Sequence, residues 1–220
     1  IPEDCELFVL NGATSDITED EQKGIVDYLQ QGGKVLVLLG ETEKDTPYLD
    51  AIFEEYGLER ESGYIADIQR SYQQNPYYVF PLLSLGEAYA KGMSSEMVLL
   101  INAQGFTQTE PKRESITVDA FMNTSTDGYA VTAEEEKQGT YVLGATATES
   151  ISANSVSENE EEEELESRLT VLGAGTMIDA GVTDTFSTLE NLTLFMNVVG
   201  ANFGEDTNIS IEPKSLEVTY

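Results

Sequence analysis

The stretch that decides the fold is residues 6–40, ELFVLNGATSDITEDEQKGIVDYLQQGGKVLVLLG. It contains two short apolar runs, at residues 7–10 and 35–39, with a helical pattern between them. Thr18 and Glu21 have the spacing of a capping box, which predicts the start of a helix. Apolar runs without polar alternation are typical of strands that are buried on both faces, and a helix between two such strands indicates a parallel pair. The stretch therefore predicts a strand–helix–strand unit of a layered α/β domain.

Similar apolar runs at residues 97–101 and 169–172 extend the predicted core sheet. Further along the chain, the residues that favour helix starts are Thr46 with Pro47 and Ser187 with Glu190. The length suits one domain, possibly elaborated by insertions. We therefore expect residues 1–220 to form a single α/β domain, with a three-layer, flavodoxin-like, mostly parallel sheet and irregular insertions.

Two segments are predicted to be insertions. Residues 67–81 are rich in tyrosine and polar residues, which indicates a long loop. Residues 150–166 contain five consecutive glutamates and little apolar surface to bury, which predicts a disordered acidic excursion between two strands. Calcium binding would need oxygen ligands at turn-like spacing together with aspartate and glycine, and a plain glutamate run lacks them. No metal site is predicted.

The charge and composition disfavour several classes of function. The chain has 41 acidic and 11 basic residues and a formal net charge of -30, so nucleic acid and anionic membrane surfaces are not expected partners. It has no histidine, which removes the usual general base, the usual zinc ligand and Ser/Cys-His triads. The single cysteine, Cys5, precedes the first predicted strand, whereas a nucleophile elbow follows its strand. We therefore expect no catalytic residue and no cofactor, and we predict that the domain is not an enzyme.

Candidate binding residues follow from the predicted sheet, because ligands of open parallel sheets bind beyond the carboxyl ends of the strands. The loops at that edge supply six candidate ligand-binding residues: Asn11, Gly12, Thr14, Ser15, Glu41 and Thr176. The alternative is that they are ordinary strand-to-helix turns. Three tyrosines of the predicted loop, Tyr72, Tyr77 and Tyr78, are candidate partner-binding residues, since tyrosine offers contact area and a hydrogen-bonding tip. The alternative there is a lid of packed tyrosines.

An ordered set of motifs resembles a known family. The motifs are NG with ITEDE within residues 11–21, YLQQGGKVLVL at 28–38, RLTVLG at 168–173, ENLTLFMNVV at 190–199 and ISIEPK at 209–214. Together they resemble the GldG-like auxiliary proteins of ABC transport systems, which are named from gliding motility. The soluble region of these proteins is similar to a flavodoxin-like, amidotransferase-like domain that is also seen in an intraflagellar transport subunit.

The resemblance implies a domain on the extracytoplasmic side of the cell membrane, with an ABC permease and an ATPase as partners. No apolar run in the chain approaches the roughly 20 residues of a membrane span, so we expect the anchoring spans outside residues 1–220, in a longer protein. The leading hypothesis is a non-catalytic domain that binds a protein partner or an exported ligand. The first alternative is a carboxylate-dependent hydrolase of cell-surface carbohydrate or peptide. The second is a free-standing binder of a nucleotide or flavin, although the chain lacks a glycine-rich phosphate loop.

Overall fold

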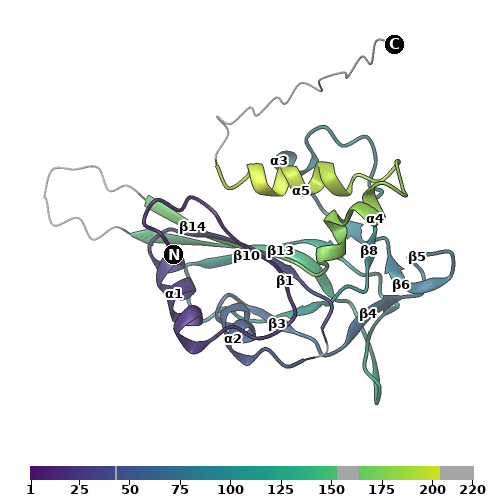
Figure 1. Ribbon diagram of the computed structural model, residues 1–220, viewed down its shortest axis with the longest axis horizontal. Coiled ribbons are helices and arrows are strands. Elements are labelled where there is room, and N and C mark those ends of the chain that lie inside the picture. Colours follow the sequence, from purple (N-terminus) through teal and green to yellow (C-terminus); the bar gives the residue numbers. More distant parts are fainter. Residues whose placement is uncertain (43, 153–163, 204–220) are drawn as a thin grey trace, which may run out of the picture.

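The structure is a computed structural model that describes residues 1–42, 44–152 and 164–203 (Figure 1). The first half of the chain forms β1 (Phe8–Ala13), α1 (Glu19–Gln30), β2 (Lys34–Leu39), α2 (Pro47–Glu55), β3 (Leu58–Arg60), β4 (Tyr64–Asp67), β5 (Ser71–Tyr72), β6 (Asn75–Val79), β7 (Leu82–Leu83), α3 (Glu87–Ala90), β8 (Leu100–Ile101) and β9 (Phe106–Gln108). The second half forms β10 (Ile116–Asn123), β11 (Gly128–Val131), β12 (Glu136–Gly139), β13 (Val142–Ser152), β14 (Glu164–Leu172), the 3-10 turn η1 (Gly175–Ile178), α4 (Ala180–Thr183) and α5 (Asn191–Gly200).

The largest sheet is mixed. Its strands follow the order β1-β2-β14-β13-β10-β7, and β9 joins β13 to β3. Strands β1, β2 and β14 run parallel to one another, whereas β14, β13, β10 and β7 are joined by antiparallel pairings. Two smaller sheets, β12-β11-β4 and β5-β6-β8, are wholly antiparallel. The fold is therefore β-rich, with many antiparallel neighbours.

This topology shows that the predicted three-layer, flavodoxin-like, mostly parallel sheet is wrong. The physical reason is that an apolar run indicates that a strand is buried on both faces but does not indicate whether it runs parallel or antiparallel to its neighbours. Strand β13 is buried along nearly its whole length, as β2 is, yet it runs antiparallel to β14. The local prediction holds, because β1 and β2 pair in parallel with α1 between them.

Local signals placed the first two helices correctly and misplaced the start of the last one. The Thr18–Glu21 capping box is present at the start of α1, and Pro47 is the first residue of α2. The capping box predicted at Ser187 is wrong, because α5 begins at Asn191. The Glu190 carboxylate instead accepts a hydrogen bond from the Ser94 backbone N–H at 2.9 Å. Glu190, which the local pattern assigned to a capping box, therefore binds a residue that is distant in the chain instead.

Several predicted segments have other boundaries. Of the predicted strand at 97–101, only Leu100–Ile101 forms a strand, and it belongs to a small sheet rather than the core sheet. Residues 67–81, predicted as a loop, contain the β5–β6 hairpin. The ends of the predicted acidic excursion are also corrected, since β13 runs to Ser152 and β14 starts at Glu164. The remainder of that excursion and the ISIEPK motif lie outside the described residues.

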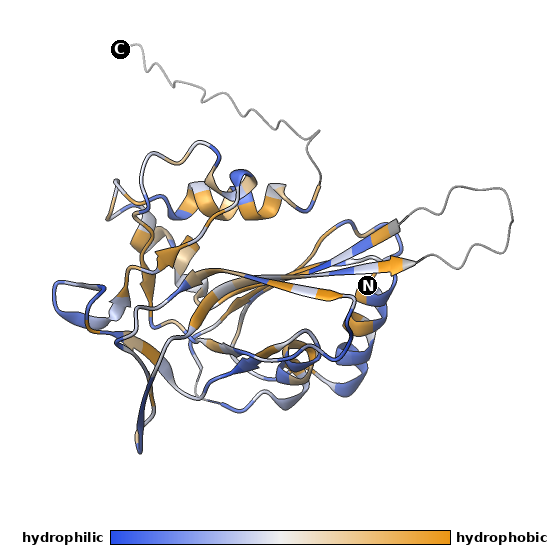
Figure 2. Cartoon of the chain, turned by 180° about the vertical axis from the view of Figure 1, so that it is seen from behind, coloured by the Kyte–Doolittle hydropathy of each residue, from blue (hydrophilic) through white to orange (hydrophobic). Residues whose placement is uncertain are grey.

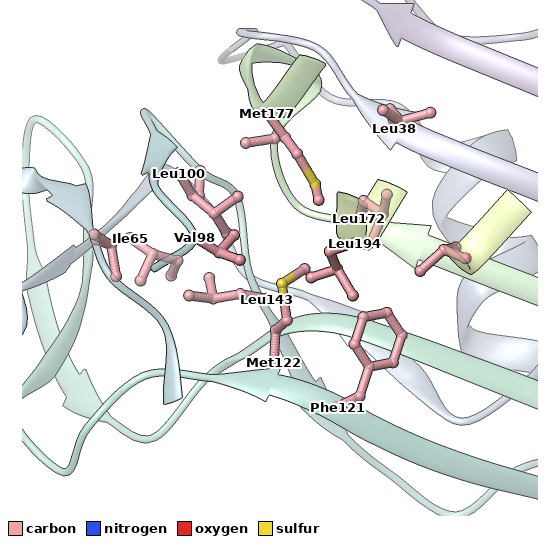
Figure 3. Close-up of a cluster of buried hydrophobic side chains, with 14 of the residues drawn as sticks. Leu38, Ile65, Val98, Leu100, Phe121, Met122, Leu143, Leu172, Met177 and Leu194 are labelled. Carbon is pink, nitrogen blue, oxygen red and sulfur yellow. The ribbon is translucent and has the colours of Figure 1, made fainter. Parts of the chain in front are cut away.

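The core lies on both faces of the main sheet. Along β2, Leu36 and Leu38 face the cluster that contains Leu194 and Val198 of α5. Their neighbours on β2 face a second cluster under α1 and α2, with members that include Val35, Val37, Leu39, Leu29 and Phe53. Figure 3 shows the first cluster, and Figure 2 shows apolar residues gathered along the strands and α5. Alternate side chains of one strand thus anchor helices on opposite faces.

Among the described residues, none of the helices has the length and apolar character that crossing a membrane requires.

Candidate functional site

The predicted binding edge exists where β1, β2 and β14 end. Because these strands are parallel, the loops that follow them lie together. Thr42 Oγ1 donates a hydrogen bond to the Thr14 carbonyl oxygen at 3.3 Å, which joins the first loop to the second. Gly175 in the third loop lies so close that an added Cβ would be 3.5 Å from Asn11 Oδ1. The three loops therefore form one surface, which we call the strand-end edge.

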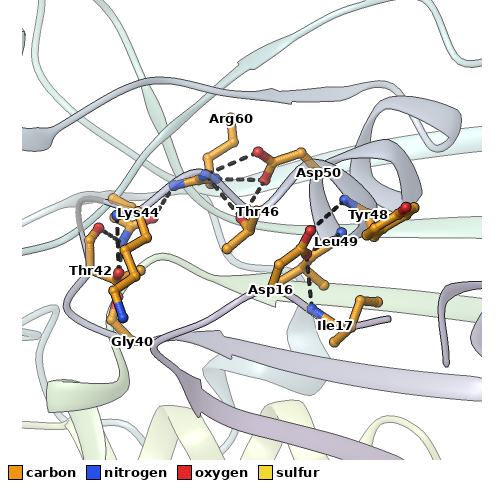
Figure 4. A network of polar contacts seen from close by, with 11 residues as sticks. Asp16, Ile17, Gly40, Thr42, Lys44, Thr46, Tyr48, Leu49, Asp50 and Arg60 are labelled. Atoms are coloured by element: carbon orange, nitrogen blue, oxygen red, sulfur yellow. Dashed lines mark hydrogen bonds and ion pairs between the residues drawn. The ribbon is translucent and has the colours of Figure 1, made fainter. Parts of the chain in front are cut away.

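Asp16 attaches the first loop to α2 (Figure 4). Its carboxylate accepts hydrogen bonds from the backbone N–H groups of Ile17 at 2.9 Å, Tyr48 at 3.0 Å and Leu49 at 3.1 Å. The last two belong to the first turn of α2, where backbone N–H groups lack helical partners and negative charge is favourable. Asp16 therefore serves as the N-terminal cap of a helix more than thirty positions away in the chain.

Arg60 and Gln104 brace the second loop. The Arg60 guanidinium binds both Asp50 oxygens, at 2.6 and 2.9 Å, and donates to Gln104 Oε1 at 2.7 Å. Gln104 Nε2 in turn donates to the carbonyl oxygens of Gly40 at 2.8 Å and Thr42 at 3.0 Å. A continuous set of side-chain hydrogen bonds thus runs from α2 through β3 to the loop after β2. Such a network limits the conformations of that loop.

Four of the six candidate ligand-binding residues have side chains available to a ligand. These four are exposed and make no side-chain hydrogen bond to another described residue: Asn11, Thr14, Ser15 and Glu41. Gly12 is half-buried and has a φ of +66°, so it serves the backbone. Thr176 Oγ1 donates to the Ile101 carbonyl oxygen at 2.8 Å, so its hydroxyl is used by the fold. The strand-end edge therefore combines fixed loops with uncommitted polar side chains.

The three candidate partner-binding tyrosines do not form one patch. The Tyr72 ring packs edge-to-face against Phe186, with centroids 5.2 Å apart, and also against Phe80. Tyr77 and Tyr78 are neighbours in β6, so their side chains point to opposite faces of the small sheet. All three are half-buried. Partner binding by any of them stays a prediction.

A buried ionic network lies away from this edge, between α2 and β13. Glu149 is 5% exposed and is bound by Arg113, by Ser115 Oγ at 3.0 Å and by the Tyr56 hydroxyl at 3.3 Å. The hydrogen bond from Arg113 holds the pKa of Glu149 below its usual value. Burial, followed by the Glu149 charge, raises the pKa of Tyr56 to about 12. The Arg113 guanidinium also lies 5.3 Å from the centroid of the Tyr56 ring.

The carboxylates with perturbed pKa values favour the ionised form. The pKa is lowered for Glu149 by Arg113, for Glu190 by hydrogen bonds from Ser94 and for Glu21 by hydrogen bonds from Thr18. General acid catalysis at neutral pH needs a carboxyl whose pKa is raised instead. Within the described part of the chain, no three Cys, Asp or Glu side chains gather into a potential metal site.

Two hollows lie away from the strand-end edge. One, of about 700 Å³, lies at the amino end of β2 and is lined in part by Cys5, Tyr28 and Lys34. The Tyr28 hydroxyl donates to the Cys5 carbonyl oxygen there, at 2.9 Å. The other, of about 330 Å³, lies on the main sheet beside Arg168. The sequence patterns do not predict either hollow, because each is lined by segments that are distant in the chain: the first by the N-terminal segment, α1 and the residues after α5, and the second by α3 and three strands.

Comparison with known proteins informs the fold alone. No protein-family model matches the sequence, and a search of curated proteins gives no match. The mmIFT52 N-terminal domain is a similar solved structure, with a TM-score of 0.57 and 16% sequence identity over 91% of this chain and 78% of that chain. Its fold is β-rich, which agrees with the correction to the predicted flavodoxin-like sheet. An intraflagellar transport subunit also figured in the sequence resemblance, but at this identity the likeness leaves the GldG-like assignment a prediction.

Proposed function

We propose that this chain is a non-catalytic binding domain of a membrane-anchored auxiliary component of an ABC transport system, and that it acts on the extracytoplasmic side. The motif resemblance supports the transport system, with the permease and ATPase of the same system as its partners. The observation that carries the binding role is the strand-end edge, where Asn11, Thr14, Ser15 and Glu41 are exposed on braced loops.

Bracing matters because binding to a mobile loop costs conformational entropy, about 0.5–1.5 kcal/mol for each side chain that is immobilised. The Asp16 cap and the Arg60–Gln104 network have already fixed the backbone of two of the three loops. The polar side chains at the edge are short, apart from Glu41, so little rotamer freedom remains to be lost. The edge is therefore suited to a polar partner surface, and we place contact with the extracytoplasmic part of the permease there.

A non-catalytic role is supported by the state of the carboxylates. Glu149, the buried member of the group with perturbed pKa values, is held ionised by Arg113 and cannot deliver a proton at neutral pH. The remaining hypothesis of a carboxylate-dependent hydrolase requires a carboxyl with a raised pKa next to a groove.

The test is a pull-down of the cognate permease by the purified domain. Replacing Asn11, Ser15 and Glu41 together by alanine is expected to weaken capture strongly while leaving the melting temperature unchanged, because these side chains are exposed and make no hydrogen bond to another described residue. Gln30→Ala, an exposed position on α1, is the matched control and is expected to retain capture. Full capture by the triple variant would refute the assignment of the edge.

Two further measurements separate the other hypotheses. Tyr77→Ala and Tyr78→Ala, made singly, test the tyrosine-based alternative, since only one face of β6 can meet a given partner. A screen of glycosides, peptides and esters tests the hydrolase alternative. Turnover that disappears when one Asp or Glu is replaced would overturn the non-catalytic proposal.

A further inference from the structure

The hollow beside Arg168 has walls from four elements. Strands β10, β13 and β14 form its floor, and α3 with its N-cap residue Gly86 forms one side. Its volume, about 330 Å³, falls at the lower end of the range of small-molecule sites, about 300–1,000 Å³. The residues that line it are Gly86, Glu87, Ala88, Tyr89, Thr117, Asp119, Thr146, Thr148 and Arg168.

Strand register explains why polar side chains meet in this hollow. Thr117 pairs with Thr148, and Thr148 pairs with Arg168, so these three form one row across the sheet. Two positions along each strand, Asp119 pairs with Thr146 to begin a second row on the same face. The intervening residues face the core beneath α1 and α2. The sheet therefore has one face that is apolar under α5 and polar in the hollow.

Arg168 is a largely buried cation with few partners. Its side chain is 17% exposed, and its ion pair among the described residues is with the exposed Glu166 at 3.4 Å. Nη2 donates to the Tyr89 hydroxyl at 3.1 Å, and Tyr89 is hydrogen-bonded to Thr146 at 2.8 Å. Nε is buried and has no hydrogen-bond partner among the described residues. A guanidinium has five N–H donors, and the contacts to Glu166 and Tyr89 use two of them, so an anionic group in the hollow can accept hydrogen bonds from the remaining N–H groups of Nη1 and Nη2.

The hollow also contains two acidic side chains, one from β10 and one from α3. Asp119 and Glu87 are exposed at the hollow and form no ion pair with a described residue. Asp119 is two strands and two residues away from Arg168 in the register, roughly 11 Å between backbones at ordinary strand spacing. A simple anion would be repelled by the two carboxylates, and a simple cation would be repelled by the guanidinium. A ligand that carries both charges a short distance apart can place each charge beside the opposite charge of the protein.

We propose that this hollow binds a free α-amino acid as its zwitterion. The ligand carboxylate binds Arg168, the ammonium group binds Asp119, and Thr148, on the strand between theirs, lies beside the ligand. A sugar is less well matched, because the Tyr89 side chain is buried and offers no open ring face for stacking. The site is separate from the strand-end edge, so it does not depend on the proposed transport function.

The experiment is isothermal titration calorimetry of the whole chain against the standard L-amino acids. Acetate and methylamine serve as single-charge probes, and glucose serves as an uncharged polyol. We expect at least one amino acid to bind and the three other probes to give no heat. No binding by any amino acid, or tighter binding of glucose or acetate, would overturn the proposal.

Two variants assign the charges. Asp119→Asn keeps the size of an exposed side chain. It is expected to lower the affinity for the amino acid by roughly tenfold or more, because one charge-assisted hydrogen bond is lost. Arg168→Lys keeps the charge but loses the planar set of donors, and it is expected to lower the affinity for the amino acid by a similar factor. Asp27→Asn, on the exposed face of α1, is the control. Unchanged affinity in Asp119→Asn, in a protein whose melting temperature matches the wild type, would refute the assignment.

Discussion

Replacing Tyr56 by phenylalanine tests the buried network through its dependence on pH. The Tyr56 hydroxyl is fully buried and donates a hydrogen bond to Glu149 at 3.3 Å. Burial, and then the charge of Glu149, raises its pKa from 10.0 to about 12. Since the folded-state pKa lies above the unfolded value, the stabilisation is complete below pH 10 and is lost as the pH rises toward 12.

Two terms of opposite sign set the expected difference between the two proteins. At neutral pH, Tyr56→Phe loses one hydrogen bond and is less stable by about 1 kcal/mol. As the pH rises from 10 through 12, ionisation of Tyr56 removes stability from the wild type but not from the variant, by about 1.4 kcal/mol per pH unit and roughly 2.7 kcal/mol in all once the pH is above both pKa values. The phenylalanine variant has no such group to ionise. The stability curves are therefore expected to cross near a pH of about 10.7, above which the variant is the more stable protein.

The measurement is urea unfolding of both proteins at a series of pH values from about 8 to about 12, with the free energies compared at each pH. Taking the difference cancels the other tyrosines and the lysines, which titrate in both proteins. Tyr48→Phe, at an exposed position on α2, is the matched control. A wild-type advantage that stays constant through pH 12 would refute the account of Tyr56 as a buried, neutral donor.

Three further outcomes are expected. Asp67→Asn should destabilise the fold by about 2–4 kcal/mol in thermal or urea unfolding. One oxygen of the buried carboxylate accepts a hydrogen bond from the Ser125 N–H at 2.7 Å and the other accepts from the Ser125 hydroxyl at 2.8 Å, whereas asparagine keeps one oxygen and its NH2 group would face one of these donors. A change below about 0.5 kcal/mol would contradict this. Gly63→Ala should give little folded protein, as judged by circular dichroism, because φ is +80° and a Cβ would overlap the Val131 carbonyl oxygen; a wild-type melting temperature would count against it. Glu149→Gln should be less stable than wild type at neutral pH. The difference in unfolding free energy should narrow as the pH falls below 4.5, because a group with a lowered pKa gives stability that is lost on acidification. A difference that does not change with pH would show that the charge of Glu149 does not contribute to stability.

The elements that could be predicted from sequence are those with local causes. The capping box of α1 and the proline at the start of α2 involve residues within one turn of each other, so the chain around them decides the outcome. Strand direction has no such local cause. β13 and β14 are consecutive strands and antiparallel, whereas β1 and β2 are consecutive strands and parallel, and β14 is parallel to β2 on its other side.

The candidate site shows the same division. The loops after parallel strands could be located, because their positions follow from the ends of apolar runs, and Asn11, Thr14, Ser15 and Glu41 lie together at the surface as that reasoning requires. The braces could not be found, since Gln104 reaches Gly40 across 64 positions and nothing in the sequence pairs the two. The sequence places Arg168 only in a strand motif, because its neighbours in the hollow come from other elements.

The position of β14 in the main sheet has a consequence for how the protein is made. Strand β2 is paired on one side with β1, which precedes it closely, and on the other with β14, which the ribosome supplies only after more than a hundred further residues. Until then the nascent chain exposes one edge of β2 together with the apolar residues Val35 to Leu39. Pairings of such long sequence separation slow folding, and unpaired strand edges recruit other chains. Folding of the main sheet therefore waits until β14 has been synthesised, and a nascent chain halted before β14 would be prone to aggregate through the edge of β2.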